Sequence, residues 1–152
     1  MCLQSKWIFP RKAAKDIVCY KILTKDDNGD LITPYQNFPI GNIKELPITV
    51  EGGKGKSIKQ YIKCIKYLYE YSKNIVHSIM TEFKCKEEGY IHAYTHLHDA
   101  EWIAIVSRPS FGKYIIVKCI IPKGTLYHIA SDGLEICARK IAILEVFRSI
   151  II

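Results

Sequence analysis

The sequence predicts one α+β domain: a mostly antiparallel sheet of about five or six strands with two main helices. Short runs of β-branched and aromatic residues alternate with clusters of Gly, Pro, Asn and Asp, which is typical of antiparallel strands and their turns. Two longer stretches instead repeat apolar residues at helical spacing. A chain of 152 residues can bury a single sizeable core, so we expect residues 1–152 to form one domain.

The first half of the chain contains three strand signals. Residues 16–23, Asp-Ile-Val-Cys-Tyr-Lys-Ile-Leu, read as a strand. Residues 26–30, Asp-Asp-Asn-Gly-Asp, predict a turn, because Asn and Gly accept positive φ at low cost. The returning strand is expected over residues 31–35, where a proline shortens it. A further short strand is expected at residues 48–50, inside a connection rich in Pro and Gly.

Residues 57–79 give the clearest helical pattern, and we interpret residues 57–83 as a helical insertion. Ser57 is the expected N-cap. Residues 79–83 fit the end of this helix or the start of a strand. On the face opposite the apolar residues lies a lysine stripe made of Lys56, Lys59, Lys63, Lys66 and Lys73.

The second half predicts a strand at residues 89–94, followed by a helix over residues 97–107 with Thr95 as its cap. Residues 113–121 are almost continuously apolar, which indicates a central strand buried on both faces. Two turn signals follow, Pro122-Lys123-Gly124 and Asp132-Gly133, and the segment from Glu135 to Glu145 ends in a final strand over residues 140–147.

Charge and cysteine content indicate the kind of partner and the cellular compartment of the protein. The formal net charge of +7 favours an anionic partner, although a solvated basic surface explains it equally well. Six cysteines form no CxxC motif, and Cys19, Cys119 and Cys137 fall in apolar strand patterns, where a thiol acts as a small hydrophobe. Free thiols predict a reducing compartment. No segment resembles a signal peptide or a membrane span, so a cytoplasmic protein without membrane contact is expected.

Histidines 92, 96 and 98 form an HxxxHxH run. Three imidazoles could hold a zinc ion with one open position. His92 belongs to a predicted strand, whereas His96 and His98 lie at the entry of a helix, and no cysteine or carboxylate stands at ligand spacing. We therefore expect no metal site and interpret these as surface or helix-entry histidines.

Polar side chains on three predicted strands predict a shared cleft. Tyr20, Lys21, His92, Tyr94 and Glu135 would converge there if the strands are neighbours. A carboxylate can orient ribose hydroxyls and stabilise an oxocarbenium-like state, and an imidazole or lysine can bind phosphate oxygens. Tyrosines on strands more often pack with only the hydroxyl at the edge.

Two further sequence patterns could bind anions. The lysine stripe could follow a phosphate backbone, with salt-sensitive and sequence-independent affinity, although a charged face opposite an apolar one is also usual for a surface helix. The glycines at positions 52, 53 and 55 precede a capped helix and could hold an anion. Their spacing does not match GxxxxGK[ST], so nucleotide hydrolysis is not predicted, and a GxSxG serine motif is also missing.

Several short segments together resemble a family of small uncharacterised proteins from gut Bacteroidetes and phages. The likeness covers most of the chain outside residues 40–88 and implies fold and setting, since no activity is attached to that family. The segments are Val18-Cys19-Tyr20-Lys21, Thr33-Pro34-Tyr35-Gln36, Gly89 to Tyr94, Ala100 with Trp102, and Val117 to Gly124.

A fainter likeness is to ADP-ribosyltransferases. In that family an early strand carries an Arg or His, a middle strand leads into a helix, and a late strand carries a Glu after a turn. Pro122 to Thr125 and Glu135 are similar to the last part, and Gly89 to Trp102 to the middle part. The early strand has Tyr20-Lys21 in place of the Arg or His. The resemblance implies NAD as cofactor.

The leading hypothesis is a small cytoplasmic, phage-linked accessory protein that binds an anionic nucleotide-like ligand or an acidic protein without catalysis and with no cofactor. Sequestering a nucleotide signal of host defence is one use of such binding. The expected ligand contacts are Lys21, His92, Tyr94, Arg108, Lys118 and Arg139.

Two alternatives remain, and one feature bears on assembly. The first alternative is an ADP-ribosyltransferase-like enzyme using Glu135 with His92 or Tyr20 as catalytic residues. The second is a non-specific nucleic-acid binder acting through the lysine stripe. The apolar tail, Ile150 to Ile152, predicts a homo-oligomer if it does not pack against its own chain.

Overall fold

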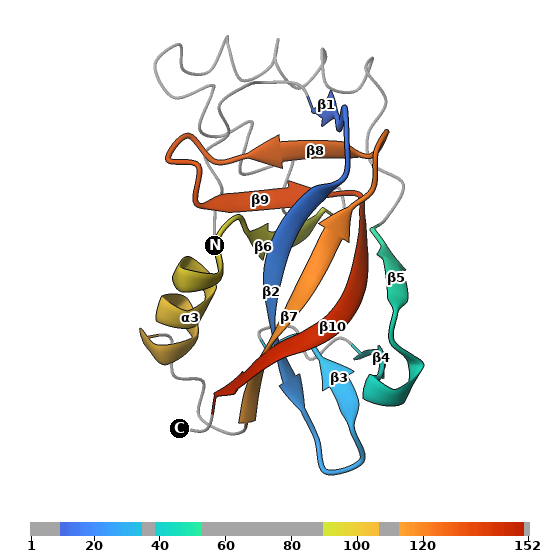
Figure 1. Ribbon diagram of the computed structural model, residues 1–152, viewed down its shortest axis with the longest axis vertical. Helices are drawn as coiled ribbons and strands as arrows, with labels where there is room; N and C mark the ends of the chain where they lie inside the picture. The colour runs from blue at the N-terminus through green and yellow to red at the C-terminus, as the bar shows by residue number, and fades with distance from the viewer. Residues whose placement is uncertain (1–9, 35–38, 53–89, 107–112, 151–152) are drawn as a thin grey trace, which may run out of the picture.

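The computed structural model describes residues 10–34, 39–52, 90–106 and 113–150, and within these ranges the chain is mostly β-sheet (Figure 1). The ten strands are β1 (Arg11–Lys12), β2 (Ile17–Lys25), β3 (Asp30–Ile32), β4 (Pro39–Asn42), β5 (Ile48–Glu51), β6 (Ile91–Tyr94), β7 (Lys113–Ile121), β8 (Leu126–Ile129), β9 (Glu135–Ala138) and β10 (Lys140–Ile150). They are accompanied by one α-helix, α3 (Leu97–Val106), and a short 3₁₀ turn, η1 (Ile43–Glu45).

All strands belong to one sheet, and every pairing in it is antiparallel. The main order is β1-β8-β9-β6-β2-β7-β10-β5, while β3 pairs with β2 and β4. Figure 1 shows that β8 and β9 run across the top of the view, whereas β2, β7 and β10 run steeply down it. The sheet therefore turns strongly between its two halves, as twisted sheets do.

The predicted fold class is wrong in its proportions. A sheet of five or six strands with two main helices was expected, but the described residues form ten strands and one α-helix. Three of the unexpected strands, β1, β4 and β8, contain only two to four residues. Strands this short carry too few residues to show a period of two, and pairing with their neighbours defines them. The predicted insertion at residues 57–83 lies outside the described residues.

The two strongest strand predictions, residues 16–23 and 113–121, are confirmed as β2 and β7. These strands lie side by side at the middle of the sheet, in continuous register from Ile17↔Ile121 to Lys25↔Lys113. Four successive residues of β7, from Tyr114 to Val117, are buried, which agrees with a strand covered on both faces.

The turn between β2 and β3 forms as predicted. The carboxylate of Asp26 accepts hydrogen bonds from the amides of Asn28 and Asp30, both at 2.9 Å. Gly29 has φ of 83°, a conformation that costs a glycine little. The hairpin therefore depends on an Asp side chain at its start and on a Gly near its end.

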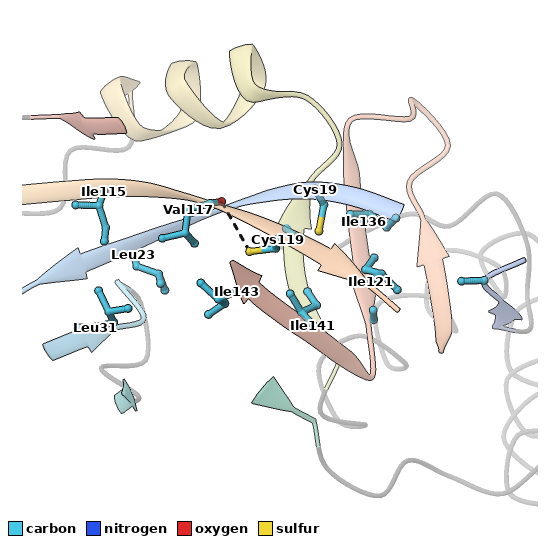
Figure 2. Packing of buried hydrophobic residues seen from close by; sticks show 13 residues of the cluster. Cys19, Leu23, Leu31, Ile115, Val117, Cys119, Ile121, Ile136, Ile141 and Ile143 are labelled. Atoms are coloured by element: carbon cyan, nitrogen blue, oxygen red, sulfur yellow. Dashed lines mark hydrogen bonds between the residues drawn. The ribbon is translucent and has the colours of Figure 1, made fainter. Parts of the chain in front are cut away.

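One face of the sheet, here called the core face, packs the larger apolar cluster. Leu23, Val117, Cys119, Ile121 and Ile143 are at most 1% exposed in this cluster. Figure 2 shows these side chains gathered from β2, β7 and β10. Cys19, Cys119 and the separately placed Cys137 are fully buried and take part in no disulfide, which confirms their interpretation as small hydrophobic residues.

The opposite face, here called the helix face, is covered in part by α3. Ala100 and Ala104 of the helix pack on Ile22 of β2 and on Tyr114 and Ile116 of β7. Alanines let the helix backbone approach the strands closely. The other side of α3 exposes Trp102, Ile105 and Val106, each by half or more.

Thr95 has a different role from the predicted one. The helix begins at Leu97, and the carbonyl of His96 accepts the first helical hydrogen bond, from Ala100. The Thr95 hydroxyl instead donates to the carbonyl of Gly133 at 2.6 Å. Thr95 thus fastens the entry of α3 to the turn before β9.

No membrane-spanning segment is expected from the sequence. Neither helical segment within residues 10–34, 39–52, 90–106 and 113–150 combines the length and apolar character needed to cross a membrane.

Candidate functional site

A row of polar side chains crosses the helix face. Lys118 lies directly opposite Tyr20, Tyr20 opposite Tyr94, and Tyr94 opposite Glu135, so four adjacent strands each contribute one residue. On β10, Glu145 lies opposite Lys118 and extends the row by one strand. Directly opposed residues of antiparallel strands place their side chains on the same face. We call these five residues the polar row.

Strand periodicity explains how the row arises. On β2, Cys19 and Leu23 contribute to the core face, so Tyr20 and Ile22 lie on the helix face. On β7 the same alternation sends Cys119 to the core face and Lys118 to the helix face. The residues that fill the core therefore also determine which polar residues remain on the other side.

Burial changes along the row. Tyr94 is only 8% exposed and packs in the cluster beneath α3. Tyr20 is half-buried, and its ring meets that of Phe147 edge to face, with centroids 5.9 Å apart. Lys118 and Glu135 are also half-buried, whereas Glu145 is exposed. Tyr94 thus serves packing, and the accessible groups lie on either side of it.

The polar row contains three charged groups, one ammonium and two carboxylates. Within the described part of the chain, no hydrogen bond or ion pair engages the Lys118 ammonium or the carboxylates of Glu135 and Glu145. Burial raises the pKa of Glu135, and the nearby charge of Asp132 raises it further. A partly desolvated carboxylate and a partly desolvated ammonium that lack partners among the described residues are costly to folding, so they favour a ligand that supplies partners.

His92 lies on the same face as the row. It precedes Tyr94 by two residues on β6 and is directly opposite Cys137, which in turn is opposite His128 on β8. His128 is fully buried, with its ring edge-on to Tyr90 at 5.3 Å. Of the predicted catalytic residues, Tyr20 and Glu135 therefore share one cross-strand row, and His92 lies beside it.

Lys21 departs from the predicted cleft. It is next to Tyr20 on β2 and opposite Val117, so its side chain lies on the core face. Its Nζ donates to the backbone carbonyl of His92 at 2.7 Å. Burial lowers the pKa of Lys21, and the nearby thiols of Cys119 and Cys19 oppose that change. Lys21 therefore links β2 to β6 on the core face and cannot reach a ligand on the helix face.

The other predicted contacts are scattered. Arg139 lies at the junction of β9 and β10, away from the row, where its amide donates to Leu126 O at 3.1 Å. Arg108 and the lysine stripe fall outside the described residues. Ile150 packs against the cluster under α3, while residues 151 and 152 also fall outside the described residues.

The histidine run is spread over two elements. His92 lies on β6, whereas His96 and His98 are exposed at the start of α3, and His96 Nδ1 is 3.4 Å from Asp99 Oδ2. Among the residues that the structure describes, no three His, Cys, Asp or Glu side chains come together to ligate a metal ion.

Two features were missed at the sequence level. Glu145 joins the row because of the register between β7 and β10, and a depression near Arg139 forms only where the end of β5, the turn between β7 and β8, and the start of β10 meet. The period of two along β2 did carry one usable signal, since adjacent Tyr20 and Lys21 must point to opposite faces.

No protein-family model, curated protein or solved structure matches the chain. The resemblances to the phage-associated family and to ADP-ribosyltransferases therefore stay predictions, and the geometry alone supports a function.

Proposed function

We propose that the protein binds a small anionic, nucleotide-like ligand along the polar row and does not transform it. The observation that carries this proposal is the unbroken register that aligns Lys118, Tyr20, Tyr94 and Glu135 across four strands. Three strand spacings separate Lys118 from Glu135, about 14 Å at ~4.8 Å per strand, which suits an extended nucleotide.

Each accessible group of the row could contact one part of such a ligand. The Lys118 ammonium can pair with a phosphate oxygen. Tyr20 presents an aromatic ring and a hydroxyl beside it, and Phe147, which is 46% exposed, adds apolar surface for a base. The two oxygens of the Glu135 carboxylate can accept hydrogen bonds from neighbouring ribose hydroxyls.

The same geometry supports binding over catalysis. Stabilising an oxocarbenium-like state requires an ionised carboxylate close to the reacting carbon. Burial and the charge of Asp132 both raise the pKa of Glu135, which opposes that ionisation. The lysine that was expected beside Glu135 lies on the other face of the sheet.

Calorimetric titration with AMP, ADP and ADP-ribose tests the proposal, with adenosine as the uncharged comparison. Lys118→Gln should weaken binding of the phosphorylated probes by about 10-fold or more, because a hydrogen bond to a charged group contributes about 1.5–3 kcal/mol. Adenosine affinity should stay unchanged in that variant. Lys44→Gln, an exposed lysine on η1, is the matched control.

Absence of binding for all three phosphorylated probes contradicts the proposal. An equal loss in Lys44→Gln also contradicts it, because binding would then follow net charge alone.

A transferase of the ADP-ribosyltransferase type is the second candidate, because Tyr20 and Glu135 flank Tyr94 in one row with His92 beside it. Incubating the protein and a cell lysate with labelled NAD distinguishes the two. Label transfer that is lost in Glu135→Gln would replace the binding-only function. The nucleic-acid alternative, through the lysine stripe, predicts affinity for single-stranded DNA that falls steeply as salt rises.

The resemblance to a phage-associated family supports one use of nucleotide binding. A small protein that sequesters a nucleotide signal of host defence needs affinity and no chemistry, which suits a row without a catalytic set. An acidic protein that places a carboxylate or phosphate against Lys118 would use the same surface.

A further inference from the structure

Two cysteine thiols face each other at the middle of the sheet. Cys19 of β2 lies directly opposite Cys119 of β7, inside the continuous register of these two strands. Both side chains belong to the core face, both are fully buried, and neither takes part in a disulfide. Figure 2 shows the two residues close together in the apolar cluster. Apolar packing calls for a small side chain at each position, but it does not call for two sulfur atoms in direct opposition.

The backbone geometry of this pair suits a disulfide. Directly opposed residues of antiparallel strands have Cα atoms about 4.5 Å or about 5.5 Å apart, according to the type of pair. Disulfides join residues whose Cα atoms lie about 4.4–6.8 Å apart. Both types of opposed pair fall inside that interval. A bond between Cys19 and Cys119 therefore requires rotation of the two side chains and little movement of β2 and β7.

The surroundings of the sulfur atoms keep both residues as thiols at rest. Interaction with the Cys19 thiol is the main cause of the raised pKa of Cys119, ahead of burial, and it acts only between close neighbours. The Cys119 thiol also donates to the carbonyl of Val117 at 3.7 Å. The Lys21 ammonium acts in the opposite direction and lowers the pKa of Cys119. Lys21 thus supplies a nearby positive charge that stabilises a thiolate when one forms.

Access to the pair is available along one edge of β2. Strand β6 pairs with β2 only at Tyr20↔Tyr94, so residues 17–19 have no strand on that side within the part of the chain that the structure describes. Local opening at such an edge exposes buried groups without global unfolding. A small oxidant can reach Cys19 during these openings, and we expect the reaction to be slow because each opening is brief.

We propose that Cys19 and Cys119 are a redox pair that closes to a disulfide when the protein meets a peroxide. One thiolate attacks hydrogen peroxide and breaks its O–O bond, which gives a sulfenic acid and a hydroxide that takes up the thiol proton as water. The second thiol then attacks the sulfenic sulfur, so the S–S bond forms and a second water leaves. Two thiols and one peroxide thus give one disulfide and two waters.

The disulfide would lock the two central strands together. A bridge between positions 19 and 119 encloses about 100 residues, and the stabilisation by a disulfide grows with the length of the enclosed loop. The next opposed pair along the same strands is Tyr20↔Lys118, so the lock would also fix the spacing between these two residues. The inference goes beyond the proposed function, because neither sulfur belongs to the polar row and its test requires no ligand.

Treatment of the folded protein with hydrogen peroxide, followed by alkylation of the remaining thiols and tryptic mapping without reductant, tests the pair. The expected product joins peptides 16–21 and 119–123, each of which contains one cysteine. The joined peptides should weigh two hydrogen atoms less than their sum, and the midpoint of thermal unfolding should rise by about 10 °C. Dithiothreitol should reverse both changes.

Cys137→Ala is the matched control, because Cys137 is equally buried but has His92 and His128 opposite it. This variant should form the bridge as the wild type does. Cys19→Ala and Cys119→Ala should lose both the joined peptides and the rise of the midpoint. Thermal unfolding before oxidation shows whether each variant is folded, and either one alone decides the question.

Three outcomes would overturn the redox pair. The first is that both residues remain thiols, or are oxidised separately to sulfinic acids, after prolonged exposure to peroxide. The second is a joined product that forms only when urea has unfolded the protein. The third is a joined product that leaves the unfolding midpoint unchanged, since the disulfide would then not lock β2 to β7.

Discussion

The two faces of the central strands have opposite characters although the same strands build them. On β2, Leu23 is fully buried on the core face, whereas Tyr20 on the helix face is half-buried and lies opposite Lys118. On β7, Cys119 and Lys118 repeat the contrast. The core face resembles the interior of any folded domain, while the helix face keeps polar groups that packing does not need. A substitution should therefore affect stability on one face and binding on the other.

Leu23→Ala should give the largest change in the free energy of unfolding. Leu23 is fully buried among apolar neighbours, and removing three carbons there costs about 3 kcal/mol through lost burial and a residual cavity. Val18→Ala, on the same strand but 45% exposed on the helix face, is the matched control and should cost under about 1 kcal/mol. Urea denaturation of both variants measures the difference. Equal losses would mean that the two faces do not differ as described.

Thr95→Val should cost about 1 kcal/mol, because the variant loses the hydroxyl that donates to Gly133 O at 2.6 Å. This contact secures α3, the only described helix on the helix face, to the turn before β9. Thr49→Val removes an exposed hydroxyl on β5 and should be nearly neutral. Thermal unfolding of the Thr95→Val and Thr49→Val variants provides the measurement. Equal unfolding midpoints would show that Thr95 does not anchor α3.

Lys21→Met tests the one charged residue on the core face. Burial holds the pKa of Lys21 below its ordinary value of 10.5, so the unfolded chain binds more protons between the folded pKa and 10.5. The wild type should therefore gain stability as pH rises through that window, and the variant should lack this gain. At pH 7 the two should agree within about 1 kcal/mol, since the lost bond to His92 O and the removed burial of charge oppose each other.

Urea denaturation of wild type and Lys21→Met at pH 7, 8, 9 and 10 isolates this contribution, because the two proteins differ only at this residue. Parallel stability curves would show that Lys21 titrates as a solvated lysine.

Glu135→Gln should have the smallest effect on stability. The raised pKa of Glu135 means that the ionised form disfavours folding above the folded pKa, and that this cost disappears as pH falls through the folded pKa to 4.5. The variant should be more stable than wild type at pH 7 by a few tenths of a kcal/mol, within the range of surface substitutions, and equal to it near pH 4. The free energies of unfolding of wild type and variant, measured at pH 7 and at pH 4, test this difference. A variant less stable than wild type at pH 7 would indicate a favourable partner for the carboxylate.

The sequence indicated the long strands and missed several of the short ones, β1, β4 and β8, for a physical reason. Residues 113–121 contain enough apolar residues to identify β7, while Leu126 to Ile129 form a strand only because β1 and β9 pair on either side. The balance of helix and sheet was therefore wrong, although antiparallel pairing was correct.

The candidate site was predictable in composition but not in arrangement. Tyr20, Tyr94 and Glu135 were recognised as polar residues on separate strands, yet their alignment depends on β6 lying between β2 and β9. Register is a property of the folded sheet, so nothing in the local sequence could supply Glu145. The placement of Lys21 could have been excluded, because neighbours along a strand face opposite ways.

The sheet is joined at its middle by a single pair of residues. Between β2 and β6 the register contains only Tyr20↔Tyr94, and one residue further along β2 the Lys21 ammonium bonds to His92 O. The half containing β8, β9 and β6 and the half containing β2, β7 and β10 thus meet at a narrow seam. The polar row crosses this seam, so a bound molecule would contact both halves of the sheet and hold them together. Slower amide hydrogen exchange in β6 would then show that the ligand is bound at the polar row.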